Sequence, residues 1–309
     1  KVIAYKQNFN ESYANNNGVK IFYRDYGPVD GIPILLVQGL GGQLSFWPPH
    51  LLAFLAENGF RPIVYDNRDV GLSSRFYNKS FTFLNYLKYY LRLPINSEYL
   101  IDDMADDGIS VLDALDIDRA HILGISMGGM IGQIITSKFP ERVITYTQLA
   151  STILTPSPLN GPSMTIRKLV LKRSMNPNAT IEEKLERALR IYSELSIFDY
   201  DYLKTEVAEF FLANIKRGGD DNGFGRQVTA ILATRDRIQK VRKINRPTLI
   251  IHGDEDPMIK VRNAYIAHKN IPNSKLVIVK GMKHLIEEPV FQEFKEDLYK
   301  HLTNNNANN

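Results

Sequence analysis

The chain has 309 residues and a mass of 35.3 kDa, which exceeds the commonest domain size but suits a single-sheet α/β domain with an insertion. Hydrophobic residues make up 44% of the chain and charged residues 23%, and these values exclude a disordered chain, collagen or a coiled coil as the overall architecture. The net charge of +4 is too small an excess to indicate a nucleic-acid partner.

Absent residue types narrow the classes of protein further. The sequence has no cysteine, which excludes disulfides, thiolate metal sites and a cysteine nucleophile. No apolar run approaches the ~20 residues that cross a bilayer, so no stable membrane span is expected. Because the chain begins with Lys1 rather than Met, the compartment stays open: cytoplasmic, or periplasmic or secreted after removal of a leader. The polar tail, residues 304–309, is expected to be frayed.

Short apolar runs alternate with helix-length segments in the first half of the chain and again near its end, which is typical of βαβ units. Several runs are nearly unbroken strings of β-branched residues and leucine, as in parallel strands covered on both faces. The expected strands are residues 19–23, 34–37, 63–65, 121–123, 143–149, 248–251 and 276–279. The expected helices are residues 51–58, 100–115, 127–138, 261–269 and 290–302. We therefore predict an α/β fold with a doubly wound, mostly parallel sheet.

The strand pattern stops between about Pro156 and Arg237, where proline, asparagine and amphipathic helical stretches prevail. We expect residues 1–155 and 238–303 to form a catalytic core and residues 156–237 an inserted helical cap, or lid. Aromatic and leucine residues in this segment suit an apolar pocket, although a cap core explains most of them equally well. They include Leu169, Leu171, Phe198, Tyr200, Tyr202, Phe210, Phe211 and Phe224.

Two charge clusters are interpreted as solvated helix faces. The first is acidic and lies in the first turns of the expected helix 100–115, where carboxylates suit the helix dipole; metal binding is the alternative. It comprises Asp102, Asp103, Asp106 and Asp107. The second is the basic run from Arg235 to Arg246, for which an anionic surface or partner is the alternative.

The motif with the clearest chemistry is Gly-x-Ser-x-Gly at residues 124–128, with Ser126 at its centre. An expected strand runs directly into it and an expected helix leaves it. A strained strand-to-helix turn lifts the serine hydroxyl clear of the backbone, and flanking glycines allow neighbouring segments to approach. Ser126 is therefore the candidate nucleophile, and the alternative is a purely structural Gly-Ser turn.

A serine nucleophile needs a base, and the base needs an orienting acid. His284 is the best of six histidines, because it follows a loop that leaves the last expected strand and precedes a helix. The others are placed in helices or loops or at strand ends: His50, His121, His252, His268 and His301.

For the acid, the loop after the penultimate expected strand offers three carboxylates. Asp254 directly follows a glycine and resembles a turn former, and Glu255 points elsewhere if the turn is tight. Asp256 is preferred and Asp254 is the main alternative. No pair of histidines has the helical spacing of zinc hydrolases, so no metal is expected.

The glycine-rich loop at residues 38–42 follows a buried strand and can present backbone amides to a developing negative charge. The amides of Leu40 and of Met127, the residue after the candidate nucleophile, are the expected oxyanion donors. A phosphate-binding loop is the rival interpretation, and it fails because the sequence lacks Gly-x-x-x-x-Gly-Lys-Ser/Thr and a spaced dinucleotide fingerprint.

Together, the order Ser126, Asp256, His284, the early glycine-rich loop and the Asp-Asn-Arg-Asp-Val-Gly-Leu-Ser segment at residues 66–73 resemble the α/β-hydrolase superfamily. The Asp-Asn-Arg-Asp version resembles its esterase branch of the aclacinomycin methylesterase type. The resemblance implies eight strands, a lid over the strand ends and hydrolysis without a cofactor. Two positions depart from the usual family pattern: Asp69 replaces a glycine, and Gln38 stands where many members have histidine.

The leading hypothesis is a cofactor-free serine hydrolase that cleaves carboxylic esters of short to medium chain length through an acyl-enzyme. A serine at position 126 excludes relatives that need a carboxylate nucleophile there. A carbon–carbon bond hydrolase or perhydrolase with the same triad is one alternative, and a non-catalytic ligand-binding relative is another. The expected partner is a small-molecule ester, and a homodimer stays open.

Overall fold

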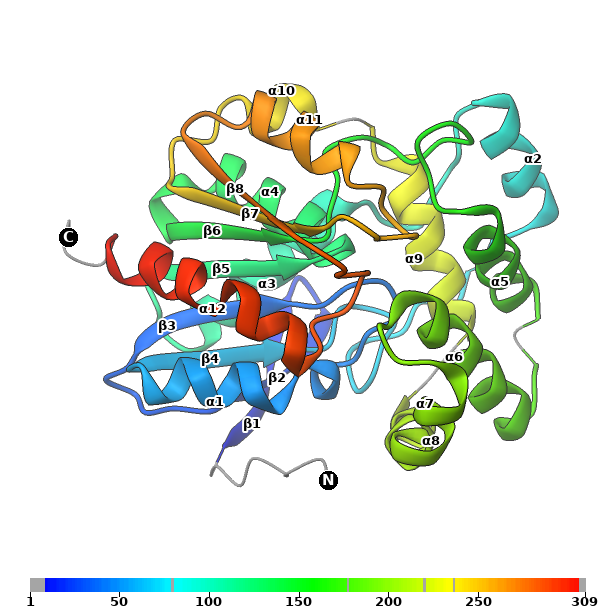
Figure 1. Cartoon of the computed structure of the whole chain (residues 1–309), viewed down its shortest axis with the longest axis horizontal. Helices are drawn as coiled ribbons and strands as arrows, with labels where there is room; N and C mark the ends of the chain where they lie inside the picture. The colour runs from blue at the N-terminus through cyan, green and yellow to red at the C-terminus, as the bar shows by residue number, and fades with distance from the viewer. Residues whose placement is uncertain (1–8, 79–80, 177, 219–220, 236, 306–309) are drawn as a thin grey trace.

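The structure is a computed structural model that describes residues 9–78, 81–176, 178–218, 221–235 and 237–305. Its described residues form one sheet of eight strands in the order β1-β2-β4-β3-β5-β6-β7-β8 (Figure 1). The strands are β1 (Asn10–Asn16), β2 (Val19–Asp25), β3 (Ile32–Val37), β4 (Phe60–Tyr65), β5 (Ala120–Ile125), β6 (Val143–Leu149), β7 (Thr248–Gly253) and β8 (Ser274–Val279). β2 pairs antiparallel with both β1 and β4. The pairs from β4 onward in this order, to β8, are parallel, which confirms the predicted mostly parallel sheet.

All seven strands expected from the sequence are present, and β1 is the one that the sequence analysis missed. Its residues, Asn-Glu-Ser-Tyr-Ala-Asn-Asn, are mostly polar and exposed, with Ala14 buried. β1 lies at the edge of the sheet and pairs with β2 alone. An edge strand without an apolar run gives no periodic signal, because pairing to its neighbour rather than burial holds it in place.

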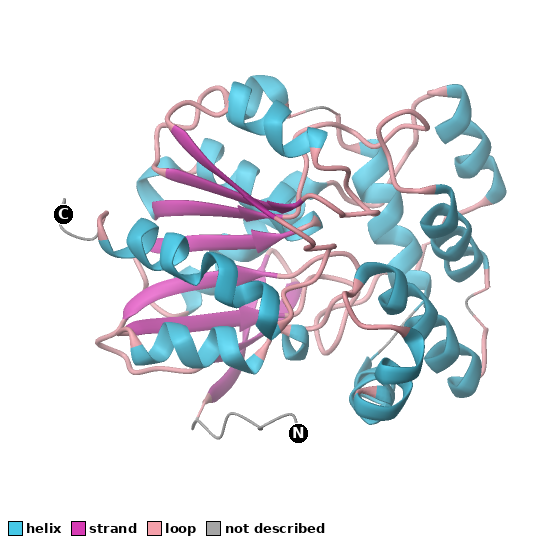
Figure 2. Cartoon of the chain, viewed as in Figure 1, coloured by secondary structure: helices cyan, strands magenta, loops and turns pink. Residues whose placement is uncertain are grey.

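Helices cover both faces of the sheet, as the doubly wound prediction requires (Figure 2). α1 (Pro49–Glu57) and α12 (Glu288–Thr303) pack on one face, where their leucine and phenylalanine side chains form a core with β3, β4 and β7. α3 (Ile101–Ala114), α4 (Met127–Lys138) and α11 (Arg262–Asn270) pack on the other face. Short helices complete the layers: η1 (Leu44–Phe46), η2 (Pro140–Arg142) and α10 (Ile238–Val241). No described helix is long and apolar enough to cross a membrane.

A second group of helices lies beyond the carboxyl ends of the parallel strands (Figures 1 and 2). We call α5 to α9 the carboxyl-end helices: α5 (Met164–Met175), α6 (Ile181–Leu195), α7 (Tyr200–Glu206), α8 (Ala208–Gly218) and α9 (Asp221–Ala233). They come from the chain between β6 and β7. α2 (Phe83–Leu91) comes from the loop after β4, yet its Tyr86 packs against a cluster that contains Phe224 and Val228 of α9.

The two charge clusters do not behave as plain solvated faces. Asp107 on α3 is fully buried and forms an ion pair with Arg68, with Nε to Oδ2 at 2.6 Å and Nη2 to Oδ1 at 2.7 Å. Arg237, in the basic run, is also fully buried and donates to Gln133 Oε1 at 2.7 Å and to Thr152 O at 2.8 Å. The solvated-face interpretation was wrong for these two residues, because each finds a partner from a distant part of the chain.

Of the tail predicted to be frayed, residues 306–309 lie outside the described residues, as does Lys1. Asn305 is described, and its side-chain amide donates to His301 O at 2.7 Å. The first part of this tail thus continues the end of α12.

Candidate active site

Ser126 is the single residue that connects β5 to α4, and its dihedral angles are φ 57° and ψ −120°. These dihedral angles are unusual for a residue with a side chain and cost about 1–3 kcal/mol. The strain has a structural cause: the chain reverses sharply from the end of a buried strand into a helix in one residue. Ser126 N donates to Leu149 O at 2.9 Å, which anchors the turn to β6. We call this sharp strand-to-helix turn at Ser126 the elbow.

The glycines of the motif are required by contact with neighbouring backbone. A Cβ on Gly128 would lie 1.9 Å from Val37 O, and a Cβ on Gly124 would lie 2.1 Å from Gly128 O. Both distances are far shorter than any real contact of a methyl group with a carbonyl oxygen. Glycine at these positions therefore lets the elbow sit directly against the end of β3 and the glycine-rich loop that follows it.

His284 and Asp256 meet at the same edge of the sheet. His284 Nδ1 lies 2.7 Å from Asp256 Oδ2, and both side chains are buried. The other carboxylate oxygen, Oδ1, accepts from the amides of Met258 at 2.8 Å and Ile259 at 2.9 Å. The His284 amide donates to Leu195 O at the end of α6. These bonds hold the carboxylate in place. They leave the second imidazole nitrogen of His284, Nε2, available for a hydrogen bond with another group.

Two neighbouring candidates have other contacts. Asp254 is exposed and its Oδ1 accepts from the Gly281 amide at 2.7 Å, so this carboxylate links the loop after β7 to the loop after β8. His252 is fully buried, and its Nε2 lies 2.6 Å from Ile259 O and 3.5 Å from Asp256 Oδ2. Burial lowers the pKa of His252, although the negative charge of Asp256 acts to raise it. A neutral His252 does not compensate the negative charge of Asp256, so this charge acts mainly on His284.

The remaining histidines lie away from Ser126 in structural contacts. The His50 ring of α1 lies 5.3 Å from the Phe291 ring at a tilt of 41°, His121 Nδ1 lies 2.7 Å from Thr145 Oγ1, and His268 Nδ1 lies 2.9 Å from Ser274 Oγ. His301 Nε2 lies 3.1 Å from Tyr146 O. The structure thus brings together only His252 and His284 with Asp256 among the six histidines, all of which it describes.

Of the four backbone amides from Gly39 to Gly42 in the glycine-rich loop after β3, three are engaged. The Gly39 amide donates to Gln38 Oε1 at 2.9 Å, the Gly41 amide to Gln227 Oε1 at 2.8 Å and the Gly42 amide to Gly39 O at 3.1 Å. The Leu40 amide has no partner among the described residues. The side chain of Gln38, where many family members have histidine, thus occupies one amide and leaves Leu40 as the donor that remains.

Two cavities meet at Ser126. The first has a volume of about 150 Å³ and an almost entirely apolar wall. Its lining comes from α2, α4, α5, α9 and the loops after β6 and β7, and it includes Tyr86, Tyr89, Met127, Met130, Val228 and Leu232. The second has a volume of about 130 Å³ and more polar groups. It is lined by the glycine-rich loop, His284 and parts of α5, α6 and α8, including Gln43, Arg173, Tyr192 and Asn214.

Leu40, Val170 and Met258 line both cavities and separate them, together with Ser126. The carboxyl-end helices supply walls to both, so they enclose the space above the elbow.

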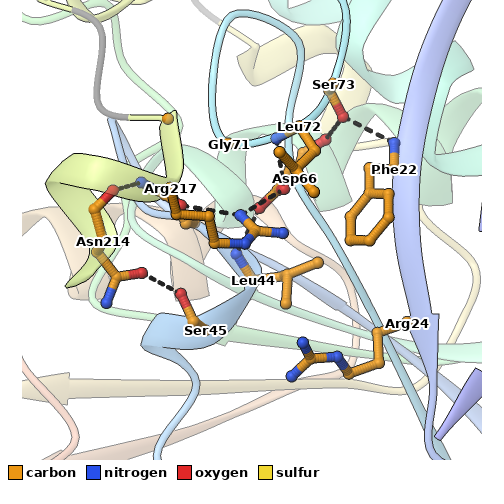
Figure 3. A network of polar contacts seen from close by, with 12 residues as sticks. Phe22, Arg24, Leu44, Ser45, Asp66, Gly71, Leu72, Ser73, Asn214 and Arg217 are labelled. Atoms are coloured by element: carbon orange, nitrogen blue, oxygen red, sulfur yellow. Dashed lines mark hydrogen bonds and ion pairs between the residues drawn. The ribbon is translucent and has the colours of Figure 1, made fainter. Parts of the chain in front are cut away.

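The loop after β4 connects the sheet to α8 through Asp66. Asp66 is fully buried; its Oδ1 accepts from the Leu44 amide at 2.8 Å, and its Oδ2 lies 2.8 Å from Arg217 Nη1 (Figure 3). Arg217 also donates to Gln43 Oε1 at 2.8 Å. Ser45 Oγ bonds to Asn214 Oδ1 of the same helix, as Figure 3 shows.

The same loop contacts α9 through Asp69, the residue that departs from the family glycine. Its backbone has φ 70°, a conformation that favours glycine, and its carboxylate is fully buried. Both carboxylate oxygens accept from Arg226, at 2.8 and 2.9 Å, and Oδ2 also accepts from Tyr99 Oη at 2.7 Å. The neighbouring Gln227 donates to Arg68 O at 2.8 Å while accepting from Gly41.

Sequence analysis did not identify Arg217, Arg226 or Gln227. One signal was available: an aspartate in place of glycine, within a buried loop, needs a cation to neutralise it. The sequence could not say which of the 38 lysines and arginines supplies that cation.

Comparison with known proteins agrees with this architecture. Residues 32–288 match the family described as alpha/beta hydrolase fold. Rhodomycin D methylesterase DauP of Streptomyces sp. (strain C5) is 27% identical over 281 residues, which cover 84% of this chain and 86% of that protein. RutD of Variovorax paradoxus (strain S110) is 36% identical over 123 residues, which cover 40% of this chain and only 39% of that protein.

Among solved structures, the enol-lactonase from Burkholderia xenovorans LB400 superposes with a TM-score of 0.71 at 22% identity and covers 94% of this chain and 100% of that chain. This likeness confirms the fold. The match of the family over most of the chain confirms the resemblance drawn from the motifs. The chain belongs to the α/β-hydrolase fold family, in which its relatives include a methylesterase.

Proposed function

We propose that this protein is a serine hydrolase that cleaves carboxylic esters of short to medium chain length. The observation that carries the proposal is the 2.7 Å contact of His284 Nδ1 with the buried Asp256 carboxylate, in a loop that lines the same cavity as Ser126. Nucleophile, base and orienting acid come from three separate strand ends, and this convergence is what acyl transfer by serine requires.

In the proposed reaction, Ser126 Oγ attacks the ester carbonyl carbon while His284 Nε2 takes the hydroxyl proton. The Asp256 carboxylate accepts a hydrogen bond from the Nδ1–H group of His284, which fixes the tautomer and stabilises the imidazolium that forms. The carbonyl oxygen becomes an oxyanion, which accepts hydrogen bonds from the backbone amides of Leu40 and Met127. His284 then returns the proton to the departing alcohol, and water cleaves the acyl-enzyme by the same route.

Two further features support this assignment. The Leu40 amide is unpartnered among described residues, and the Met127 amide is the first of α4, where helical N–H groups have no intrahelical acceptor. Two cavities on either side of Ser126 suit the acyl and alcohol parts of an ester. The methylesterase relative is consistent with an ester, and the proposed chemistry needs no co-reactant other than water.

We also propose that residues 156–237 act as a lid over a core made of residues 1–155 and 238–303. The contribution of these helices to both cavity walls supports the role, because such walls select substrate size while the reacting groups stay on the sheet. α2, from the first core segment, shares the wall of the apolar cavity and belongs functionally with the lid.

A fluorophosphonate probe tests the central assignment. It should label the protein once, at Ser126, and the Ser126→Ala variant should remain folded and unlabelled. Ser151→Ala is a matched control, because Ser151 Oγ donates to Ser126 O, next to the elbow, while Ser151 lines neither cavity. Labelling that persists in Ser126→Ala would show that another residue is the nucleophile, and a protein with no labelling at all would support a non-catalytic relative.

A further inference from the structure

α2 exposes an apolar face that the rest of the described chain leaves uncovered. None of its nine residues, all of which the structure describes, is buried. Phe83 is 64% exposed, Leu84 57%, Leu87 44% and Leu91 58%. These four side chains fall within about 100° of one another around the helix axis, so they form one stripe. We call Phe83, Leu84, Leu87 and Leu91 the α2 patch.

The patch lies directly over the apolar cavity. On the other side of the same helix, Tyr86 and Tyr89 line that cavity, and Tyr86 packs against Phe224 and Val228 of α9. Figure 1 shows α2 at the rim of the molecule, beside the carboxyl-end helices and away from the sheet. One helix thus separates an exposed apolar surface from the chamber that leads to Ser126.

The segment of chain that contains α2 carries charge of one sign. Between Val70 and Ser97 the sequence carries four basic residues and no aspartate or glutamate. Two of the basic residues lie on α2 or at its end: Lys88 in the last turn and Arg92 at the C-cap. A helix with leucine and phenylalanine on one side and flanking cations has the composition of helices that lie in the headgroup layer of a membrane.

We propose that the α2 patch docks on the surface of a lipid layer, with Lys88 and Arg92 directed to anionic headgroups. The apolar side chains then enter the boundary between headgroups and acyl chains, and lipid-dissolved esters reach the apolar cavity from beneath α2. The second part rests on the proposed esterase function, whereas docking does not.

A second copy of this chain is the competing occupant, and the charge pattern argues against it. A two-fold contact through α2 would place the same cations near each other, with no carboxylate between Val70 and Ser97 to pair with them. An anionic lipid surface neutralises the same cations. The pattern therefore favours lipid.

Sedimentation with lipid vesicles tests docking without any need for turnover. The full chain carrying Ser126→Ala is mixed with vesicles of phosphatidylcholine and phosphatidylglycerol in equal amounts, and separately with phosphatidylcholine alone. We expect binding to both, at least tenfold tighter to the mixed vesicles. Leu84→Ser/Leu87→Ser should weaken both at least tenfold, and Lys88→Gln/Arg92→Gln should remove the preference for phosphatidylglycerol.

The matched control is Val29→Ser/Tyr265→Ser, which removes two apolar side chains that are 77% and 54% exposed elsewhere on the surface and should leave vesicle binding unchanged. Absence of vesicle binding, or equal binding by the α2 and control variants, would overturn the proposal. So would a dimer in size-exclusion chromatography that dissociates in the Leu84→Ser/Leu87→Ser variant, because the patch would then be a self-interface.

Hydrolysis separates this proposal from the proposed function. With Ser126 restored, Leu84→Ser/Leu87→Ser should hydrolyse p-nitrophenyl acetate in vesicle-free buffer at the rate of the unaltered protein, because neither leucine lines a cavity. It should hydrolyse 1-decanoylglycerol, an ester of medium chain length, embedded in mixed vesicles at least tenfold more slowly. An equal rate on the embedded ester would overturn entry beneath α2, whereas vesicle binding by a protein without any hydrolysis would overturn the esterase assignment and leave docking intact.

Discussion

Arg226 of α9 clamps the carboxylate of Asp69 with two parallel hydrogen bonds, Nη2 to Oδ1 at 2.8 Å and Nε to Oδ2 at 2.9 Å. Both side chains are buried. The side chain of the next residue, Gln227, accepts a hydrogen bond from the Gly41 amide and donates one to the Arg68 carbonyl. One turn of α9 therefore fixes the loop after β4 and the glycine-rich loop beside Ser126 relative to each other.

Removing one partner of this pair should be costly. Asp69→Gly restores the residue usual at this position in the family and leaves the Arg226 guanidinium buried without its counter-charge. Breaking a buried pair in this way costs about 3–5 kcal/mol. Urea unfolding should show a loss of this size, and the exposed ion pair of Arg142 with Asp113 supplies a control: Asp113→Ala should change the unfolding free energy by about 1 kcal/mol or less.

The double variant Asp69→Gly/Arg226→Met distinguishes loss of an ion pair from loss of packing. It removes the stranded charge, so it should recover much of the stability lost by Asp69→Gly. If the two substitutions destabilised additively, the ion pair would not be the source of the effect.

The two aspartates after β7 should differ strongly in their effect on turnover. Asp256→Asn should lower kcat for p-nitrophenyl acetate by about 10⁴, because an amide cannot hold His284 in the required tautomer. Asp254→Asn retains an oxygen that accepts from the Gly281 amide, so kcat should stay within about threefold of the unaltered protein. A reversed order would mean that Asp254 and not Asp256 orients the base.

Filling the apolar cavity should change chain-length preference. Val228→Phe adds a ring to a cavity of about 150 Å³, so kcat/KM for p-nitrophenyl hexanoate should fall at least tenfold while that for acetate changes little, since each refused methylene is worth ~1–3 kcal/mol. Leu232→Ala enlarges the same cavity and should shift preference towards longer chains.

Phe210→Leu is the control for these variants. Phe210 packs against Phe46 at a ring distance of 5.0 Å and lies beside Phe211, but it lines neither cavity. Its replacement should leave the ratio of hexanoate to acetate unchanged. Equal losses on both esters in Val228→Phe would contradict a role for the apolar cavity in binding the chain.

Stability should fall in mild acid because of His301. Burial lowers the pKa of His301 to about 4, whereas the unfolded residue titrates near 6.5, so the unfolded chain binds the proton first as the pH drops. The contribution of His301 is complete above pH 6.5 and is lost progressively between pH 6.5 and 4. Between pH 7 and 5 it amounts to about 2 kcal/mol.

Urea unfolding at pH 7 and at pH 5 measures this loss. His301→Gln should reduce the difference between the two pH values, whereas His268→Gln, at an exposed position on α11, should leave it unchanged. A pH difference that survives in full in the His301→Gln variant would place the titration at another buried group.

Much of the fold and several candidate residues could be predicted because their signals are local. Unbroken apolar runs predict buried parallel strands, and the glycines around Ser126 predict a turn in which a Cβ cannot fit. Chain order and position at strand ends also selected His284 and Asp256, which the fold places 2.7 Å apart. β1 was missed because its sequence is polar and its order comes from pairing with β2.

The buried ion pairs could not be predicted, because a charge that is neutralised inside a protein looks the same in the sequence as one in water. Asp107 was interpreted as solvated and is paired with Arg68, 39 positions away. Asp69 and Arg226 are separated by 157 positions. Such partners are selected only when distant segments pack and exclude water, since burial makes an unpaired charge too costly to keep. The two cavities at Ser126 could not be predicted for the same reason, because side chains from distant segments form their walls. The exposure of the α2 patch likewise depends on which segments pack against α2 in the folded chain.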